Sequence, residues 1–385
     1  MRDSGNVSDH LRLVRTEGVG PVTYRRLMER YRTPAAALDA LPRLAGAGGR
    51  SVTPTTLSRP EAERELERTA KLGGRMIFAT DPDYPALLAM LDDAPPCLIV
   101  QGDAELASAR CVATVGGRNA SANGQRMAEH LAAELAGSVV VVSGLARGID
   151  TAAHQGAMRT GRTIAVIAGG IDQPYPPENT VLQRQIAEAH LLITESALGT
   201  VPQARHFPRR NRIIAGLSLG VVVVEAAPRS GSLITARMAQ DAGREVFAVP
   251  GSPLDPRARG GNDLIRQGAV LVESAADVLD NLPPVPTGRS AGHLAEQSAQ
   301  QSLARPEYRD APLLPEQPEA PNHPPSAVDA VLALLSPEPT AVDDLVRRCQ
   351  LSPPVTMAVL LELELAARVE TLPGSRVVLL PGAVY

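Results

Sequence analysis

Small polar residues that suit phosphate binding follow one strongly apolar run of this chain. The run VVVVEA (221–226) precedes SGSLITARMAQDAG, which predicts a buried strand and then a helix that begins near Ser230. The first turn of a helix presents unpaired backbone N–H groups that bind phosphates, and Gly231 permits a close approach. Ser230, Ser232 and Thr235 add hydroxyl groups to this turn. Serines also cap helices, so this segment alone leaves a phosphate site and a simple cap as alternatives.

Two other predicted strands end in loops that combine glycine with arginine. The loop TVGGRNAS supplies Gly116, Gly117 and Arg118, and the loop SGLARGID supplies Ser143, Gly144 and Arg147. The first loop lacks the GxGxxG spacing of a dinucleotide fingerprint, which disfavours NAD or FAD as a ligand. In the second loop, Asp150 is predicted to cap the following helix, with His154 as its structural neighbour one turn later.

The most basic segment of the chain lies just before the VVVVEA run. The segment FPRRNRIIAGLS contributes the candidate residues Phe207, Arg209, Arg210, Asn211 and Arg212. Arginine binds phosphate through its planar fork, and cations in a first helical turn are unfavourable unless an anion is near. Phe207 offers a surface on which a base can stack. Alternatively, these arginines pair with Glu195 and Glu225 at the ends of two neighbouring strands.

The sequence contains no recognisable catalytic or metal-binding set. It has no GxSxG elbow, no spacing that forces a Ser–His–Asp relationship, and no CxxC pair among Cys97, Cys111 and Cys349. Nuclease chemistry would need several acids on one loop face, whereas Glu195 and Glu225 lie among arginines. We therefore expect no catalytic residues, no metal and no cofactor.

Composition indicates a globular protein with a substantial core. The chain has 385 residues, 44% of them hydrophobic, and a net charge of −4. Lys71 is the single lysine, so arginine supplies nearly all the basic residues, and base composition of the genome explains most of them. The first residues are too polar for a signal peptide, and no apolar run approaches the ~18 residues of a membrane span. We expect a reducing, cytoplasmic location away from membranes.

Residue patterns divide the chain into four parts. Residues 1–75 predict short helices, among which GVGPVTYRRL is compatible with a DNA-binding helix-hairpin-helix or with a plain packing unit. Residues 76–282 alternate nine apolar strands with amphipathic helices, which predicts a Rossmann-like, doubly wound, mainly parallel α/β sheet. Residues 283–326, rich in Pro, Gln, Ala and Ser, predict a disordered linker.

Residues 327–385 predict three helices and a β-hairpin, which together describe a winged helix. In that fold the third helix normally enters the major groove of DNA. Here the third helix, at 353–366, carries Glu362 and Glu364 and no basic residue before Arg368. Phosphates would repel such a helix, so a protein-contact role is favoured for this domain.

Several motifs, in this order, resemble the DNA-processing protein A family (DprA or Smf). They are VGGR, SGLARGID with His154, YPPEN, ITES, FPRRNRIIAGLS, VVVVEA, SGSLITA, VPG and GAVLVE. The resemblance implies a sterile-alpha-motif-like or helix-hairpin-helix domain in front and a winged helix behind. It also implies a non-enzymatic homodimer that binds and protects incoming single-stranded DNA in natural transformation and helps to load the recombinase RecA onto it.

The resemblance also assigns roles to particular arginines. Arg118 matches the arginine of the family's G-S/T-R motif, and FPRRNR matches its basic strand-binding loop. This chain has Gly117 where the family usually has Ser or Thr, which removes one possible phosphate hydrogen bond worth roughly 0.5–1.5 kcal/mol. We expect weaker contact geometry without loss of function.

An enzyme acting on nucleoside monophosphates is the alternative function. Nucleotide-cleaving glycosidases of the lysine-decarboxylase-like group use the same sheet architecture, and their PGGxGTxxE loop supplies a catalytic Glu. The comparable loop here, SGSLITAR, contains no acid. With arginines predicted around it, this loop is interpreted as part of a site for a polynucleotide backbone.

Overall fold

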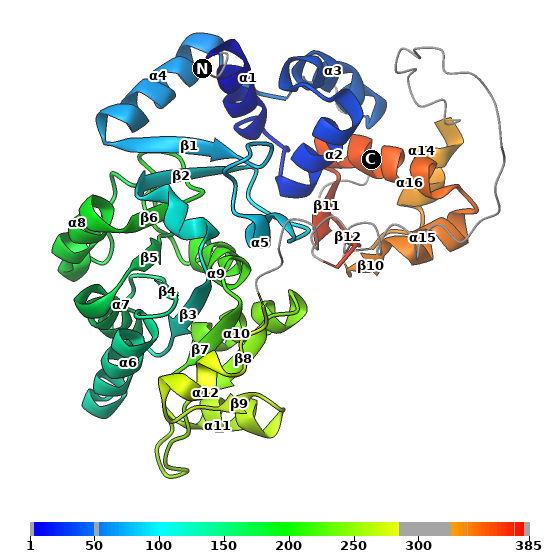
Figure 1. Ribbon diagram of the computed structural model, residues 1–385. Coiled ribbons are helices and arrows are strands. Elements are labelled where there is room, and N and C mark those ends of the chain that lie inside the picture. Colours follow the sequence, from blue (N-terminus) through cyan, green and yellow to red (C-terminus); the bar gives the residue numbers. More distant parts are fainter. Residues whose placement is uncertain (1–3, 50–53, 285–324, 337, 373, 381–385) are drawn as a thin grey trace, which may run out of the picture. The chain divides into compact units, whose positions relative to one another are not determined.

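The computed structural model describes residues 4–49, 54–284, 325–336, 338–372 and 374–380 (Figure 1). The chain folds into two compact units: Glu65–Arg289 form one, and Met1–Arg64 with Ser290–Tyr385 form the other. Almost all of the predicted linker at 283–326 lies outside the described residues. No helix in the described ranges is long and apolar enough to cross a membrane.

A nine-stranded sheet forms the centre of the unit Glu65–Arg289. Its spatial order is β1 (Gly74–Phe78), β2 (Cys97–Gly102), β6 (Leu191–Thr194), β5 (Thr163–Val166), β4 (Val140–Ser143), β3 (Cys111–Val115), β7 (Gly220–Val223), β8 (Glu245–Ala248) and β9 (Val270–Leu271). Neighbouring strands from β6 to β9 are parallel, whereas β1 and β2 form an antiparallel edge. The predicted mainly parallel, Rossmann-like sheet is confirmed.

Helices cover both faces of this sheet. One face packs against α6 (Ala122–Leu135), α7 (Ile149–Thr160) and α12 (Ala275–Leu279). The other face packs against α5 (Ala86–Ala89), α9 (His206–Leu217), α10 (Gly231–Asp241) and α11 (Arg259–Arg266). The remaining elements are α8 (Thr180–Ala189) and the short 3₁₀ helices η1 (Ala104–Ser108) and η2 (Pro177–Asn179).

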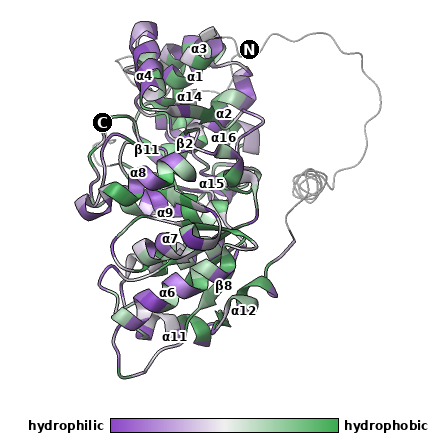
Figure 2. Ribbon diagram, turned by 60° about the vertical axis from the view of Figure 1, so that its left-hand side comes forward, coloured by the Kyte–Doolittle hydropathy of each residue, from purple (hydrophilic) through white to green (hydrophobic). Residues whose placement is uncertain are grey.

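Two covered faces explain why the strand sequences are continuously apolar. Val221 and Val223 point into the core beneath α9 and α10, whereas Val222 and Val224 point into the core beneath α6 and α7. Successive residues of a strand face opposite sides, so a strand buried on both sides needs apolar residues throughout. The outer surface of α6 carries hydrophilic bands, as expected for a helix buried on one side (Figure 2).

The chain reverses its winding direction between β3 and β7. From β3 it proceeds through β4 and β5 to β6 on one side, and β7, β8 and β9 then extend the sheet on the other side. The carboxyl ends of β3 and β7 therefore diverge into loops that leave a crevice, which is where open α/β sheets bind ligands. Both loops are among those predicted to bind phosphate.

The other unit contains the expected helical and winged-helix elements. Its helices are α1 (Ser4–Val14), α2 (Pro21–Tyr31), α3 (Pro34–Ala47), the beginning of α4 (Arg59–Lys71), α14 (Pro325–Leu332), α15 (Val342–Cys349) and α16 (Pro353–Leu365). Its small sheet has the order β10 (Thr340–Ala341), β12 (Arg376–Leu379) and β11 (Val369–Leu372). The prediction that Thr340–Ala341 begin a helix was wrong, because they pair with β12.

Helix α16 is buried between other helices of this unit. It packs against α14 and α15 on its own side and against α2 and α3 of the N-terminal helices. Glu364 lies 3.8 Å from Arg26 of α2, and both side chains are largely buried. Gly18 of the predicted hairpin turn faces the last carbonyl groups of α16. In this arrangement α16 and the hairpin turn contact protein.

We expect Gly156→Ala to destabilise the unit Glu65–Arg289 although alanine favours helix. A Cβ at Gly156 of α7 would lie 2.0 Å from the backbone oxygen of Glu129 of α6, so the two helices would have to separate. Overpacking of this kind costs about 1–3 kcal/mol, measurable by urea unfolding. Gln155→Ala, at an exposed position of the same helix, is the matched control and should change stability little. Equal stability of the two variants would contradict the close packing.

Candidate nucleic-acid interface

Two adjoining cavities lie at the carboxyl ends of the central strands. The inner pocket, about 340 Å³, is bordered by the loops that follow β4 and β5. The outer groove, about 820 Å³, extends from the loop after β3 across α9 to the beginning of α10. The two cavities share Arg118, Tyr175, Phe207 and Arg210. They therefore form one continuous recess at the switch point of the sheet.

Most of the predicted site residues line this recess. The outer groove contains Gly116, Gly117, Arg118, Phe207, Arg210, Asn211, Ser230, Gly231, Ser232 and Thr235. The inner pocket adds Gly144 and Arg147. Residues from four separate segments of sequence thus converge, as expected for loops at one edge of a parallel sheet.

Three predicted site residues line neither cavity. Ser143 is fully buried and its hydroxyl donates to the carbonyl oxygen of Thr114 at 2.7 Å. Arg212 is buried and pairs with Glu195 and Asp93, so its charge serves the fold. Arg209 is exposed, 3.7 Å from Glu195. The alternative interpretation was pairing with Glu195 and Glu225. It holds for Arg209 and Arg212 with Glu195, whereas the Glu225 carboxylate accepts hydrogen bonds from Ser121.

Arg210 is a buried cation with incomplete neutralisation. Its side chain is 6% exposed, its nearest carboxylate oxygen, on Asp150, is 4.0 Å from Nη1, and its Nε has no hydrogen-bond partner. Burial lowers the pKa of Arg210 to about 10, which leaves the guanidinium charged at pH 7. A charge held this way in a cavity wall is stabilised by an anion in the cavity.

Gly144 provides the space for the Arg210 side chain. A Cβ on Gly144 would lie 1.4 Å from Nη1 of Arg210, so no other residue type leaves the guanidinium in this position. Gly144 was predicted from the sequence as a candidate DNA-binding residue of its loop. The structure adds that it admits an arginine from α9.

Arg118 covers the aromatic wall of the recess. Its guanidinium carbon lies 4.5 Å from the centre of the Phe207 ring, a distance at which a cation and a ring attract each other. The ring of Tyr175 is tilted against Phe207 at 5.7 Å between centroids. Phe207 therefore stacks with an arginine, and a base can reach that face only if Arg118 moves.

Asp150 and His154 are structural neighbours, but the predicted cap was wrong. Helix α7 begins after Gly148, whose φ of 77° suits glycine, and Asp150 lies in the first turn. The Asp150 carboxylate accepts the Ala146 N–H at 3.3 Å, and burial raises its pKa while Arg210 opposes that rise. Asp150 is the second residue of the helix, and the positive end of the helix stabilises a carboxylate there even though it is not the N-cap.

His154 is neutral and fixed in one tautomer. The hydroxyl of Thr163 donates to the carbonyl oxygen of Val141, so Thr163 must accept its 2.7 Å hydrogen bond from Nδ1–H of His154. Nε2 is then unprotonated, and it is buried without a partner. Burial lowers the pKa of His154 to about 3, and the charge of Arg210 acts in the same direction.

The beginning of α10 serves as a capped helix end and as a wall of the groove. Ser230 caps the helix, with its hydroxyl 3.4 Å from the Ser232 N–H and 2.7 Å from the Ser232 hydroxyl. No atom lies within 4 Å of the position that a Cβ on Gly231 would take, so this turn is open. The first turn of α10 can therefore keep its serine cap and remain accessible to a phosphate.

Several residues of the recess were not predicted from the sequence. Asn119, Gln173 and Tyr175 border the inner pocket, and Arg229 and Arg257 border the outer groove. Tyr175 belongs to the YPPEN motif, which could have identified it. The loop with Arg257 has no periodicity or motif, so only the fold brings it to the groove.

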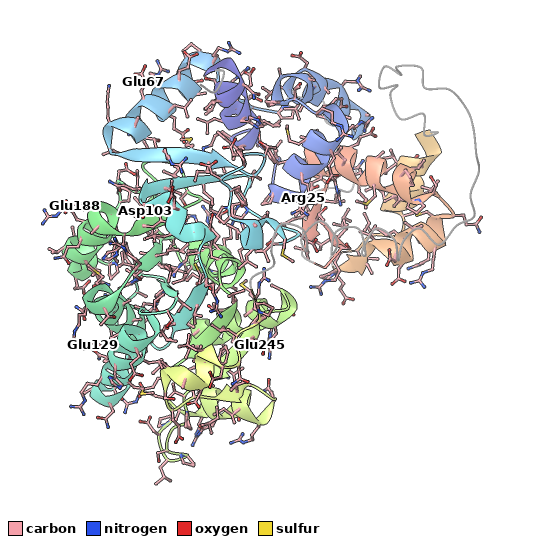
Figure 3. The ribbon with its side chains drawn as sticks, in the orientation of Figure 1. Arg25, Glu67, Asp103, Glu129, Glu188 and Glu245 are labelled. Atoms are coloured by element: carbon pink, nitrogen blue, oxygen red, sulfur yellow. The ribbon has the colours of Figure 1, made fainter. Side chains whose placement is uncertain are left out.

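Acidic groups in this unit lie largely outside the recess. Asp103, Glu188 and Glu245 are exposed and line neither cavity, and the side chain of Glu188 extends outward from α8 (Figure 3). The described lining of the outer groove contains two carboxylates, Asp150 and Glu225, and each has hydrogen-bond donors of its own. Within the ranges that the structure describes, no cluster of three His, Cys, Asp or Glu residues could hold a metal ion.

Family models match all three structured parts of the chain. The model described as DNA recombination-mediator protein A matches residues 75–283, more than half of the chain. The chain belongs to this family (DprA/Smf). The DprA-like N-terminal HHH domain matches residues 5–67, and the DprA winged helix domain matches residues 315–375. The predicted resemblance, and the helical and winged-helix domains that it implied, are confirmed.

Relatives and solved structures of the family agree with this assignment. The DNA processing protein DprA of Bacillus subtilis is 45% identical over 227 residues, 58% of this chain and 76% of the relative. Protein Smf of Synechocystis is 34% identical and aligns over 94% of this chain and 95% of its own length. The X-ray structure of DprA from Streptococcus pneumoniae superposes with a TM-score of 0.62 at 34% identity, covering 74% of this chain and 100% of that one.

A second solved structure concerns DNA processing protein A from Helicobacter pylori and its single-stranded DNA binding mode. It superposes with a TM-score of 0.50 at 28% identity, covering 55% of this chain and 97% of that one.

Replacing His154 should reduce the sensitivity of the fold to acid. Its folded-state pKa, about 3, lies below the value of about 6.5 in an unfolded chain, so protons bind the unfolded state preferentially as pH falls through this range. The stabilising effect is complete above pH 6.5 and is lost towards pH 3. Between pH 6.5 and pH 5 wild type should lose about 1.6 kcal/mol more than His154→Gln in urea unfolding. Parallel pH profiles would contradict a neutral buried His154.

Proposed function

We propose that the recess binds the phosphate backbone of single-stranded DNA. One observation carries this proposal: Arg210 is a buried charge in the wall of the recess whose nearest carboxylate oxygen is 4.0 Å away. Arg118 and Arg147 lie in the same wall, and the open first turn of α10 faces the groove. Arginine side chains and helix N–H groups are the usual protein partners of phosphate.

Single strands are favoured over duplex by the shape of the recess. The inner pocket, about 340 Å³, has the aromatic residues Tyr175 and Phe207 in its wall, so an unstacked base can enter it and stack on Phe207 once Arg118 moves off that ring. Bases in a duplex are stacked and paired and cannot enter such a pocket without disruption. The single-stranded DNA binding mode of the Helicobacter pylori relative supports the same ligand for this chain.

The wider role follows the family. We propose that the protein acts without catalysis, protects single-stranded DNA during natural transformation and recombination, and helps to load RecA onto it. It would do so in the cytoplasm and as a homodimer. Family membership and the DNA-processing names of its relatives support this role.

The alternative, an enzyme that cleaves nucleoside monophosphates, has less support in the geometry. The two carboxylates of the outer groove are engaged: Asp150 accepts the Ala146 N–H, and Glu225 accepts hydrogen bonds from Ser121. The turn at Ser230–Ser232 supplies hydroxyl groups and no acid. Groups arranged in this way bind phosphate without providing a general acid or base.

Replacing Arg118 by alanine should weaken binding of an oligothymidine and reduce its dependence on salt. Each phosphate neutralised contributes about 0.7 to the slope of log affinity against log salt, so Arg118→Ala and Arg210→Ala should each lower the slope by about that amount. Fluorescence anisotropy over a salt series measures it. Arg184→Ala, at an exposed position on α8 that is paired with Glu188, is the matched control. Unchanged affinity in an Arg118/Arg210 double variant, or sustained base release from nucleoside monophosphates by pure protein, would contradict the proposal.

Gly144→Ala should reproduce the loss caused by Arg210→Ala. The added methyl group would displace the guanidinium from its position, because it would lie 1.4 Å from Nη1. The two substitutions remove the same interaction, so the double variant should bind no more weakly than Arg210→Ala alone. Additive losses in the same anisotropy assay would show that Gly144 contributes to binding by another route.

A further inference from the structure

An acidic side chain, Glu225, lies in the lining of the groove proposed for phosphates. It follows β7 at the switch point of the sheet and lines the same groove as Arg118 and the beginning of α10. A carboxylate there repels a phosphate backbone unless hydrogen-bond donors compensate its charge. The contacts of Glu225 include such donors and indicate a structural role for this residue.

The Glu225 carboxylate occupies the positive end of α6. One oxygen accepts the Ser121 N–H at 2.9 Å, and the other accepts the Ser121 hydroxyl at 2.5 Å. Ser121 is also the N-cap of α6, and its hydroxyl accepts the Gly124 N–H at 2.9 Å. In dinucleotide-binding sheets the helix after the first strand receives a pyrophosphate at this end. Here a carboxylate of the chain itself takes that position.

The backbone of Glu225 holds the loop that carries Arg118. Its carbonyl oxygen accepts the Gly117 N–H at 2.6 Å. On the opposite side, the Gly117 carbonyl accepts the Ile149 N–H at 3.3 Å, and a Cβ on Gly148 would lie 2.4 Å from the same carbonyl oxygen. The loop is therefore fixed between β7 and the beginning of α7, one residue before the arginine.

Gly124 leaves the space that the carboxylate fills. A Cβ on Gly124 would lie 2.4 Å from the carboxyl carbon of Glu225. The two residues are 101 positions apart in sequence and belong to different strand–helix units. The fit between them is thus a property of the folded site.

We infer that Glu225 is a positioning residue for DNA binding. Its carboxylate takes the place of a phosphate at α6 and, with its backbone carbonyl, fixes the Gly116–Asn119 loop so that Arg118 faces the recess. The phosphates of the strand are then left to Arg118, Arg210 and the first turn of α10. This inference rests on the proposed function. It adds to the DNA-binding arginines a residue that acts by fixing the position of one of them.

The substitution Glu225→Gln has two effects on DNA binding, and they are opposite in sign. Removal of a negative charge from the groove would by itself strengthen the binding of a polyanion. Loss of the charged acceptor releases the Ser121 end of the loop, and binding should then weaken, by about tenfold for the loss of charge-assisted hydrogen bonds. The sign of the change distinguishes the two effects.

The experiment compares three variants of the full chain. Glu225→Gln removes the charged acceptor. Gly124→Ala displaces the carboxylate while every charge remains, and alanine favours helix over glycine. Glu178→Gln is the control, because it removes an exposed carboxylate 3.4 Å from Arg147 at the edge of the inner pocket and should leave oligothymidine binding equal or stronger. Each variant is measured for oligothymidine affinity and for hydrogen exchange of the amides at 116–125, with exchange of the central strands as the measure of intact folding.

Faster exchange at 116–125 with weaker binding in both Glu225→Gln and Gly124→Ala supports the inference. Unchanged exchange in that loop, or stronger binding by Glu225→Gln, overturns it. A third outcome separates the two proposals. If exchange is faster in Glu225→Gln and Gly124→Ala, while these two variants and Arg118→Ala all keep wild-type affinity, then Glu225 controls the loop and DNA binding at Arg118 is overturned. Gly124→Ala keeps the test available if Glu225→Gln does not fold.

Discussion

The position of Arg210 is the constraint on which the recess depends. A guanidinium is held inside the domain, against Gly144 and within reach of Asp150, and it is only partly neutralised there. Burying a charge is unfavourable unless partners or ligands compensate. Two surrounding features follow from this constraint: Gly144 has no side chain, and the cavity in front of the guanidinium is open to an anion. Burial lowers the pKa of His154, and the charge of Arg210 adds to that effect.

The arginines of one short segment divide between structure and binding. Arg212 faces Glu195 and Asp93 and stabilises the packing of α9, whereas Arg210 faces the cavity. The helix itself decides this division, because residues two positions apart in an α-helix point to nearly opposite sides of it. Glu225 shows the same division among acids, because it sits in the groove and yet serves the loop at the beginning of α6.

The elements that could have bound DNA in the other unit contact one another. The third helix of the winged helix, α16, is covered by α2 and α3, and Glu364 meets Arg26 there. Burial raises the pKa of Glu364 and lowers that of Arg26, with each partner opposing the effect of burial on the other. The acidic character of α16, which argued against groove insertion, is partly explained by this contact.

Patterns of residues along the chain are sufficient to predict the sheet, its strands and the loops that carry the site. Nine apolar runs with helical segments between them leave a doubly wound sheet as the arrangement that buries both faces, and parallel strands bring their carboxyl ends to one edge. Glycine, serine and arginine after those strands were therefore enough to predict most of the recess.

Which of these side chains face the recess depends on tertiary contacts. Ser143, Arg209 and Arg212 turn to other partners, Arg257 arrives from a loop without periodicity or motif, and Glu225 bonds with Ser121. Those choices depend on contacts between segments far apart in the chain, which local patterns of sequence do not contain.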